Sequence, residues 1–81
     1  MRASGDRVRA YVLLVVITGK EKDVLKEVKD MEGVSEANIV YGDYDLIAKV
    51  EAPSLKDLNR IVMRIRGLDS VIRSSTLISV D

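Results

Sequence analysis

The chain has 81 residues, enough for one small domain, and its 13 basic and 13 acidic side chains leave no net charge. A neutral chain has no positive field with which to attract duplex DNA, so the composition argues against direct DNA binding. Cys and His are both absent, which excludes disulfides, zinc sites and catalysis by thiol or imidazole groups. Because so small a core stabilises a fold only modestly, we expect oligomerisation to reinforce it.

The N-terminal part of the chain predicts an arm followed by a strand. Residues 1–9 are polar and predict a flexible arm ahead of a domain over residues 10–81. Residues 11–17 are apolar and mostly β-branched, which is typical of a strand covered on both faces. This run is too short to cross a bilayer, which needs about 20 residues. No cleavage site of small residues follows it, so we expect a cytoplasmic protein without membrane association.

A helix is predicted next. Thr18 and Glu21 have the spacing of a capping box, in which the Thr hydroxyl and the Glu carboxylate each accept from a free backbone N–H group. Apolar residues then recur at helical spacing, at Val24, Leu25, Val28 and Met31. Gly33 supplies a stop signal.

The middle of the chain predicts a β-hairpin. Residues 34–41 and 46–51 alternate in polarity as strands do. Between them, Gly42-Asp43-Tyr44-Asp45 has the composition of a turn, where Gly accepts positive φ and Asp bonds to nearby backbone.

A second helix and a last strand complete the pattern. Ser54 with Asp57 predicts a capped helix start, and Gly67 predicts its end. Residues 71–80 then alternate, with Ser74 and Thr76 on one face of the strand. The resulting order is βαββαβ.

This order predicts an α+β, ferredoxin-like βαββαβ fold: a four-stranded antiparallel sheet with two helices on one face. The other face of the sheet has no helix to cover it. Because residues 11–17 are apolar at every position, apolar side chains must lie on that bare face. We therefore expect a second copy of the chain to cover it, giving a dimer that associates through the sheets.

Other functions of this topology lack the residues that they need. RNA-recognition sheets stack bases on aromatic side chains, and the chain has neither Phe nor Trp. Asp43 and Asp45 have no further clustered ligands for a metal, and the hydroxyls of residues 74–76 have no base nearby in sequence. We expect no catalytic residue, metal or cofactor.

The turn Gly42-Asp43-Tyr44-Asp45, set between two strands, resembles the signature of the effector-binding (RAM) domain of the Lrp/AsnC family. The likeness covers residues 10–80 and includes a Gly33-Val34 step from helix to strand. It also includes the hydroxyl pair Ser74 and Thr76, although the family usually has Thr at the first of these positions.

The resemblance implies a stand-alone, amino-acid-binding regulatory module without the family's helix-turn-helix domain. Chains of this kind pair through their sheets, and the dimers assemble into an octamer-like particle that binds a small amino acid between dimers. Such a module modulates transcription without binding DNA itself, with full-length Lrp/AsnC regulators as candidate partners, and is not an enzyme. The implied ligand-binding residues are Gly42, Asp43, Tyr44, Asp45, Ser74 and Thr76.

In this interpretation Gly42 lets backbone approach the ligand, Asp45 meets the ligand ammonium, and Tyr44 forms a wall of the site. Backbone amides with Ser74 or Thr76 receive the carboxylate. Two alternatives stay open. The turn could serve only to build contacts in a structural oligomerisation module, or the chain could be an ACT-like amino-acid sensor, which usually binds its ligand at a Gly such as Gly19.

Overall fold

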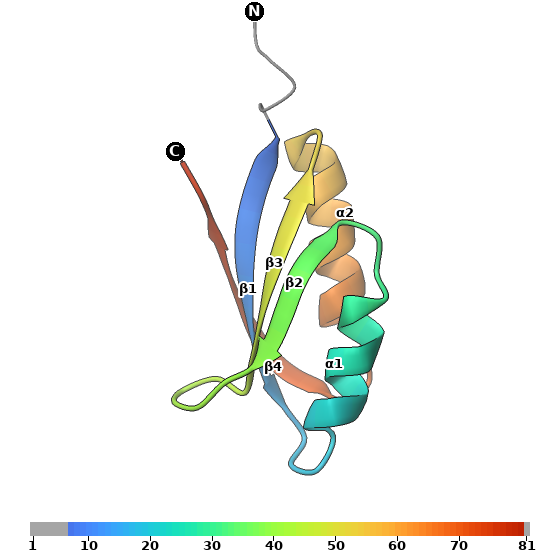
Figure 1. Ribbon diagram of the computed structural model, residues 1–81, viewed down its shortest axis with the longest axis vertical. Coiled ribbons are helices and arrows are strands. Elements are labelled where there is room, and N and C mark those ends of the chain that lie inside the picture. Colours follow the sequence, from blue (N-terminus) through green and yellow to red (C-terminus); the bar gives the residue numbers. More distant parts are fainter. Residues whose placement is uncertain (1–6, 81) are drawn as a thin grey trace, which may run out of the picture.

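The structure, a computed structural model, describes residues 7–80. Its elements follow the predicted order βαββαβ (Figure 1). They are β1 (Val8–Val16), α1 (Glu21–Lys29), β2 (Val34–Ile39), β3 (Leu46–Ala52), α2 (Leu55–Arg66) and β4 (Val71–Ile78).

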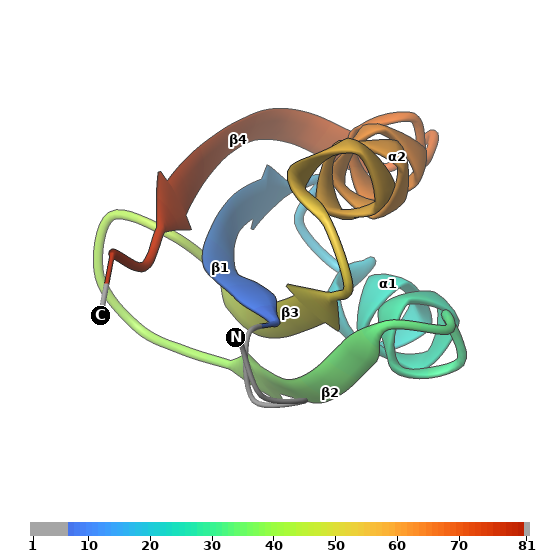
Figure 2. The ribbon, with the colours of Figure 1, turned by 90° about the horizontal axis from the view of Figure 1, so that it is seen from above.

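The four strands form one sheet in the order β2-β3-β1-β4, with every neighbouring pair antiparallel. Both helices pack on the same face of the sheet, and none of residues 7–80 forms a helix on the opposite face (Figure 2). The ferredoxin-like fold predicted from the sequence is therefore confirmed. β2 and β4 are the two edges of the sheet.

The core lies between the sheet and the helices because alternate residues of the central strands point toward them. β1 and β3 supply the sheet side, and one stripe of each helix supplies the other. The largest fully buried side chains are Leu14, Leu46, Leu58, Ile65, Val12, Val24, Val28 and Val50. Burying one such side chain stabilises the fold by roughly 1.5–3 kcal/mol, so this single layer carries most of the packing energy.

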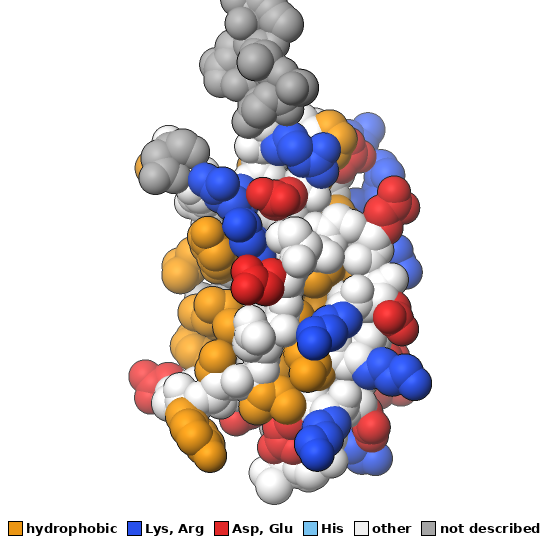
Figure 3. Space-filling view, viewed as in Figure 1, with side chains coloured by type: hydrophobic (Ala, Val, Ile, Leu, Met, Phe, Trp, Pro, Cys, Tyr) orange, Lys and Arg blue, Asp and Glu red, His pale blue; other side chains and the backbone are white. Residues whose placement is uncertain are grey.

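The face of the sheet away from the helices is apolar at its centre. Tyr11, Leu13 and Val15 of β1 lie on this face and are only half-buried. Directly paired residues of antiparallel strands share a face, which adds Ile47, the partner of Leu13, and Leu77, the partner of Tyr11. We call these five side chains the bare face. Hydrophobic side chains gather on this side of the molecule (Figure 3). A single chain thus buries one face of β1, and the covering of the other face by a second copy of the chain stays a prediction.

The predicted cap of α2 is confirmed, and that of α1 is wrong. The backbone N–H of Asp57 donates to Ser54 Oγ at 3.1 Å. In α1, Lys20 is the N-cap residue and no side chain caps the helix. The chain first makes a tight turn through Gly19, whose φ is +94°. This turn leaves Thr18 outside the helix, and Glu21 Oε1 accepts the N–H of Gly19 at 3.0 Å instead.

Some element boundaries differ from the prediction. β1 includes Val8 and Arg9, which the sequence predicts to be part of the N-terminal arm. The rest of that arm, residues 1–6, lies outside the described residues, so the arm remains a prediction. α1 ends at Lys29, and Gly33 lies in the turn that follows, with φ +94°. Within residues 7–80, neither helix is long and apolar enough to cross a membrane.

Candidate ligand-binding site

The loop between β2 and β3 carries the turn signature. Its base is closed by the N–H of Val40, which donates to the carbonyl oxygen of Asp45 at 2.8 Å. Gly42 has φ +120°, a conformation that side chains other than Gly rarely adopt. Tyr41, Gly42 and Asp43 are exposed. The loop swings out on the side of the sheet away from the helices (Figure 2).

Asp45 ties this loop to the end of β1. Its backbone N–H donates to the carbonyl oxygen of Leu14 at 2.7 Å. Its carboxylate oxygen Oδ2 accepts the backbone N–H of Val16 at 2.9 Å. Bonds of this kind fix both the loop and the direction of the carboxylate, which leaves lone pairs free for another donor. Asp45 therefore has a structural task of its own that the sequence did not reveal.

Tyr44 lies against β4. The guanidinium carbon of Arg73 is 5.8 Å from the centre of the Tyr44 ring, within the range of a cation–π contact. Arg73 pairs with Val15, so both residues are on the bare side of the sheet. The sequence did not predict this contact, because it depends on how β4 pairs with β1.

The two predicted hydroxyl residues lie on the opposite face of β4 from Arg73. Ser74 pairs with Leu14 and Thr76 pairs with Val12, and both partners point into the core between sheet and helices. Ser74 lines a small hollow that also includes Arg73. A single chain thus does not bring Ser74 and Thr76 together with Tyr44 on one side of the sheet.

Asp45 does line a hollow of about 440 Å³, formed between the loop and the turn that follows β1. This volume is within the range of small-molecule pockets, about 300–1,000 Å³. Its lining residues are Gly19, Glu21, Lys22, Ile39, Val40, Tyr41 and Asp45. The hollow thus joins the turn at Gly19, favoured by an ACT-like site, to the loop favoured by the family resemblance.

The charges in this hollow are mixed. Glu21 and Asp45 supply carboxylates and Lys22 an ammonium group, beside the apolar surfaces of Ile39 and Tyr41. Such a lining suits a small ligand that carries both charges and an apolar part. Residues 7–80 contain no group of three or more side chains that could hold a metal ion. Of these lining residues, the sequence had assigned only Asp45 to the site.

Comparison with known proteins shows the family of this chain. The family model of the Lrp/AsnC ligand binding domain matches residues 9–81. The chain belongs to the Lrp/AsnC family.

Relatives of this Lrp/AsnC domain have different overall lengths. The crystal structure of hypothetical protein PHS023 from Pyrococcus horikoshii is 42% identical with a TM-score of 0.85, covering 90% of this chain and 89% of that one. An uncharacterized HTH-type transcriptional regulator of Pyrococcus abyssi is 31% identical over 62 residues, which are 75% of this chain and 41% of the relative. A homocitrate synthase of Sulfurisphaera tokodaii is 40% identical over 57 residues, which are 70% of this chain and 12% of the enzyme. The chain thus spans less than half the length of these two curated relatives.

Proposed function

We propose that this domain binds a small amino acid in the hollow between the turn at Gly19 and the loop at Asp45, and that binding controls its association with transcription regulators. The observation that carries the proposal is the placement of the Asp45 carboxylate. The N–H of Val16 holds it at the wall of a hollow of suitable size. A fixed carboxylate is a good partner for a ligand ammonium group, while Lys22 can meet the ligand carboxylate.

Assembly is part of the proposal. The bare face presents a contiguous apolar surface that water disfavours, and a second copy of the chain would cover it, giving a homodimer through the sheets. The hollow at Asp45 is open to solvent in one chain. A neighbouring dimer in an octamer-like particle would close it, which would couple ligand binding to assembly.

We further propose that the module regulates and does not catalyse. The chain has neither His nor Cys, and its net charge of zero disfavours direct contact with DNA. Full-length Lrp/AsnC regulators, in the cytoplasm, are the proposed partners. The similarity to transcriptional regulators and to a small part of a homocitrate synthase supports a module that serves different proteins.

Calorimetric titration with all twenty amino acids, combined with particle mass from light scattering, tests the function. We expect at least one amino acid to bind and to shift the mass distribution. Asp45→Asn should abolish that response while the protein stays folded, because the amide oxygen can still accept the N–H of Val16. Asp23→Asn, an exposed change on α1, is the matched control and should behave as the parent does. If none of the twenty amino acids gives heat of binding and none changes the particle mass, the domain is not an amino-acid sensor.

A second candidate function is a structural oligomerisation module. The two hydrogen bonds that tie Asp45 to β1 favour it, because they explain this residue without any ligand. In that case Asp45→Ala should change the particle mass with no ligand effect in either protein. If the domain is a sensor, Asp45→Asn should instead lose its response to the ligand while the particle mass without ligand stays the same.

A further inference from the structure

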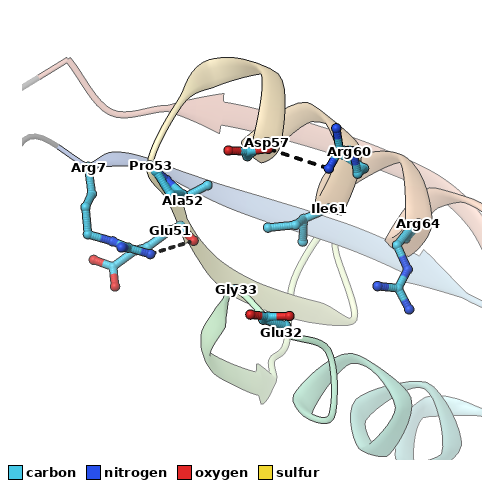
Figure 4. A pocket seen from close by; sticks show the side chains of 10 residues that line it. All are labelled: Arg7, Glu32, Gly33, Glu51, Ala52, Pro53, Asp57, Arg60, Ile61 and Arg64. Atoms are coloured by element: carbon cyan, nitrogen blue, oxygen red, sulfur yellow. Dashed lines mark hydrogen bonds and ion pairs between the residues drawn. The ribbon is translucent and has the colours of Figure 1, made fainter.

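A second hollow, of about 530 Å³, lies at the opposite end of the sheet from the Asp45 loop. It is formed where the start of β1, the turn before β2, the turn between β3 and α2, and one side of α2 come together (Figure 4). Neither the turn signature nor the family resemblance predicts a ligand site at this end of the sheet.

The walls of this hollow differ in charge. α2 contributes the guanidinium groups of Arg60 and Arg64, while Glu32 supplies a carboxylate from the turn before β2 on the other side. Ile61 projects into the space between them (Figure 4). A neighbouring hollow shares Glu32 and Arg64, so the groove continues along the end of α1.

Glu32 and Arg64 are the two charges available to a ligand. Arg60 forms an ion pair with Asp57 at 3.6 Å, and Arg7 donates to the carbonyl oxygen of Glu51 at 3.4 Å. Within residues 7–80, by contrast, no hydrogen bond or ion pair engages the side chain of Glu32 or Arg64. The lining as a whole contains three Arg and three acidic residues, so it favours neither a pure anion nor a pure cation.

The apolar floor is held in place by close packing. Gly33 has φ +94°, and a Cβ at this position would collide with the Cδ1 atom of Ile61. The carbonyl oxygen of Gly33 accepts the N–H of Glu51 at 2.8 Å, which fixes the turn before β2 against the end of β3. Ile61 and Pro53 therefore offer a preformed apolar surface beside the charges.

We propose that this groove is a second ligand site, which binds a small zwitterion with an apolar side chain. The ligand carboxylate contacts Arg64, its ammonium group contacts Glu32, and its side chain lies on Ile61. This site is separate from the hollow at Asp45, so either site can be present without the other.

Chemical-shift titration of the ¹⁵N-labelled protein tests the proposal, with the amide of Gly33 reporting on the groove and that of Gly42 on the loop. The probes are L-leucine, L-isoleucine and L-methionine. We expect a saturable shift of Gly33 with at least one of them. N-acetylleucine lacks the ammonium charge and leucinamide lacks the carboxylate, so both should bind at least about tenfold more weakly than leucine does, if leucine binds. No saturable shift of Gly33 with any probe, or equal binding of the one-charge derivatives, would overturn the proposal.

Variants separate this site from the proposed function. Glu32→Gln and Arg64→Gln should each weaken the Gly33 response at least about tenfold and leave the Gly42 response unchanged. Lys56→Gln and Glu36→Gln, two exposed charges outside the groove, are the controls and should have no effect. Unchanged binding in both groove variants would reject this second site and would leave the proposed function at Asp45 unaffected. A Gly33 response without any Gly42 response would support it and count against the loop.

Discussion

At the scale of single residues, the loop between β2 and β3 is held by residues that lie far from it in the chain. Gly42 does adopt positive φ, as the turn composition predicted. The partner of Asp45 is Val16, 29 residues earlier in the chain, and the partner of Tyr44 is Arg73 on the far edge strand. Contacts of this kind depend on how strands pair in space, which local composition does not encode.

Gly33→Ala should destabilise the fold more than Gly19→Ala does. Both positions have φ +94°, so both variants suffer the backbone strain, roughly 1–3 kcal/mol for a residue with a Cβ. Only Gly33 adds a collision with Ile61, because nothing lies within 4 Å of a Cβ at Gly19. Urea denaturation gives the two free energies of unfolding. Equal losses in the two variants would contradict the tight floor of the second hollow, and adding Ile61→Val to Gly33→Ala should recover part of the difference.

At the scale of elements, polarity patterns predicted all six helices and strands, since apolar spacing reflects which face is buried. They did not predict which β4 side chains lie on the same side of the sheet as the loop. The register shifts between Val15 and Val16 of β1, where β4 has an irregularity. Ser74 and Thr76 lie outside this shift and pair with the buried Leu14 and Val12, so they lie on the core side of the sheet. Only a neighbouring chain could bring such hydroxyls to a loop on the bare side.

The two predicted helix caps give a direct test. Ser54→Ala should lower the free energy of unfolding by about 1 kcal/mol, because it removes the acceptor for the N–H of Asp57. Thr18→Ala should change it by only a few tenths, since Thr18 caps no helix. Thermal or urea unfolding of both variants measures the difference. A loss of similar size in Thr18→Ala would show that this hydroxyl does cap α1.

At the scale of the whole molecule, the two hollows lie at opposite ends of the sheet, and the bare face lies between them on the side without helices. The composition indicated a need for oligomerisation, and the apolar run of residues 11–17, which does not alternate, predicts that the bare face is the contact surface. Neither could show that the turn at Gly19 and the loop at Asp45 share one hollow, because that follows from the spatial proximity of the end of β1 to the start of β3.

Leu13→Arg should disrupt the proposed dimer. It places a charge at the centre of the bare face, where it would be buried without a partner in the assembly. Leu55→Arg is the control, since Leu55 is 57% exposed on α2, outside this face. Light scattering should give the mass of a smaller particle for Leu13→Arg only. An unchanged mass for Leu13→Arg would mean that the copies associate through another surface.

The central claim is that an amino acid binds between the turn at Gly19 and the loop at Asp45. A crystal structure of the assembled protein, grown with whichever amino acid gives heat in the titration, tests it most directly. The account predicts ligand density beside the Asp45 carboxylate, with the ligand ammonium group within hydrogen-bonding distance of it. Ligand density confined to the groove at Glu32 and Arg64, with the hollow at Asp45 filled only by water, would contradict it.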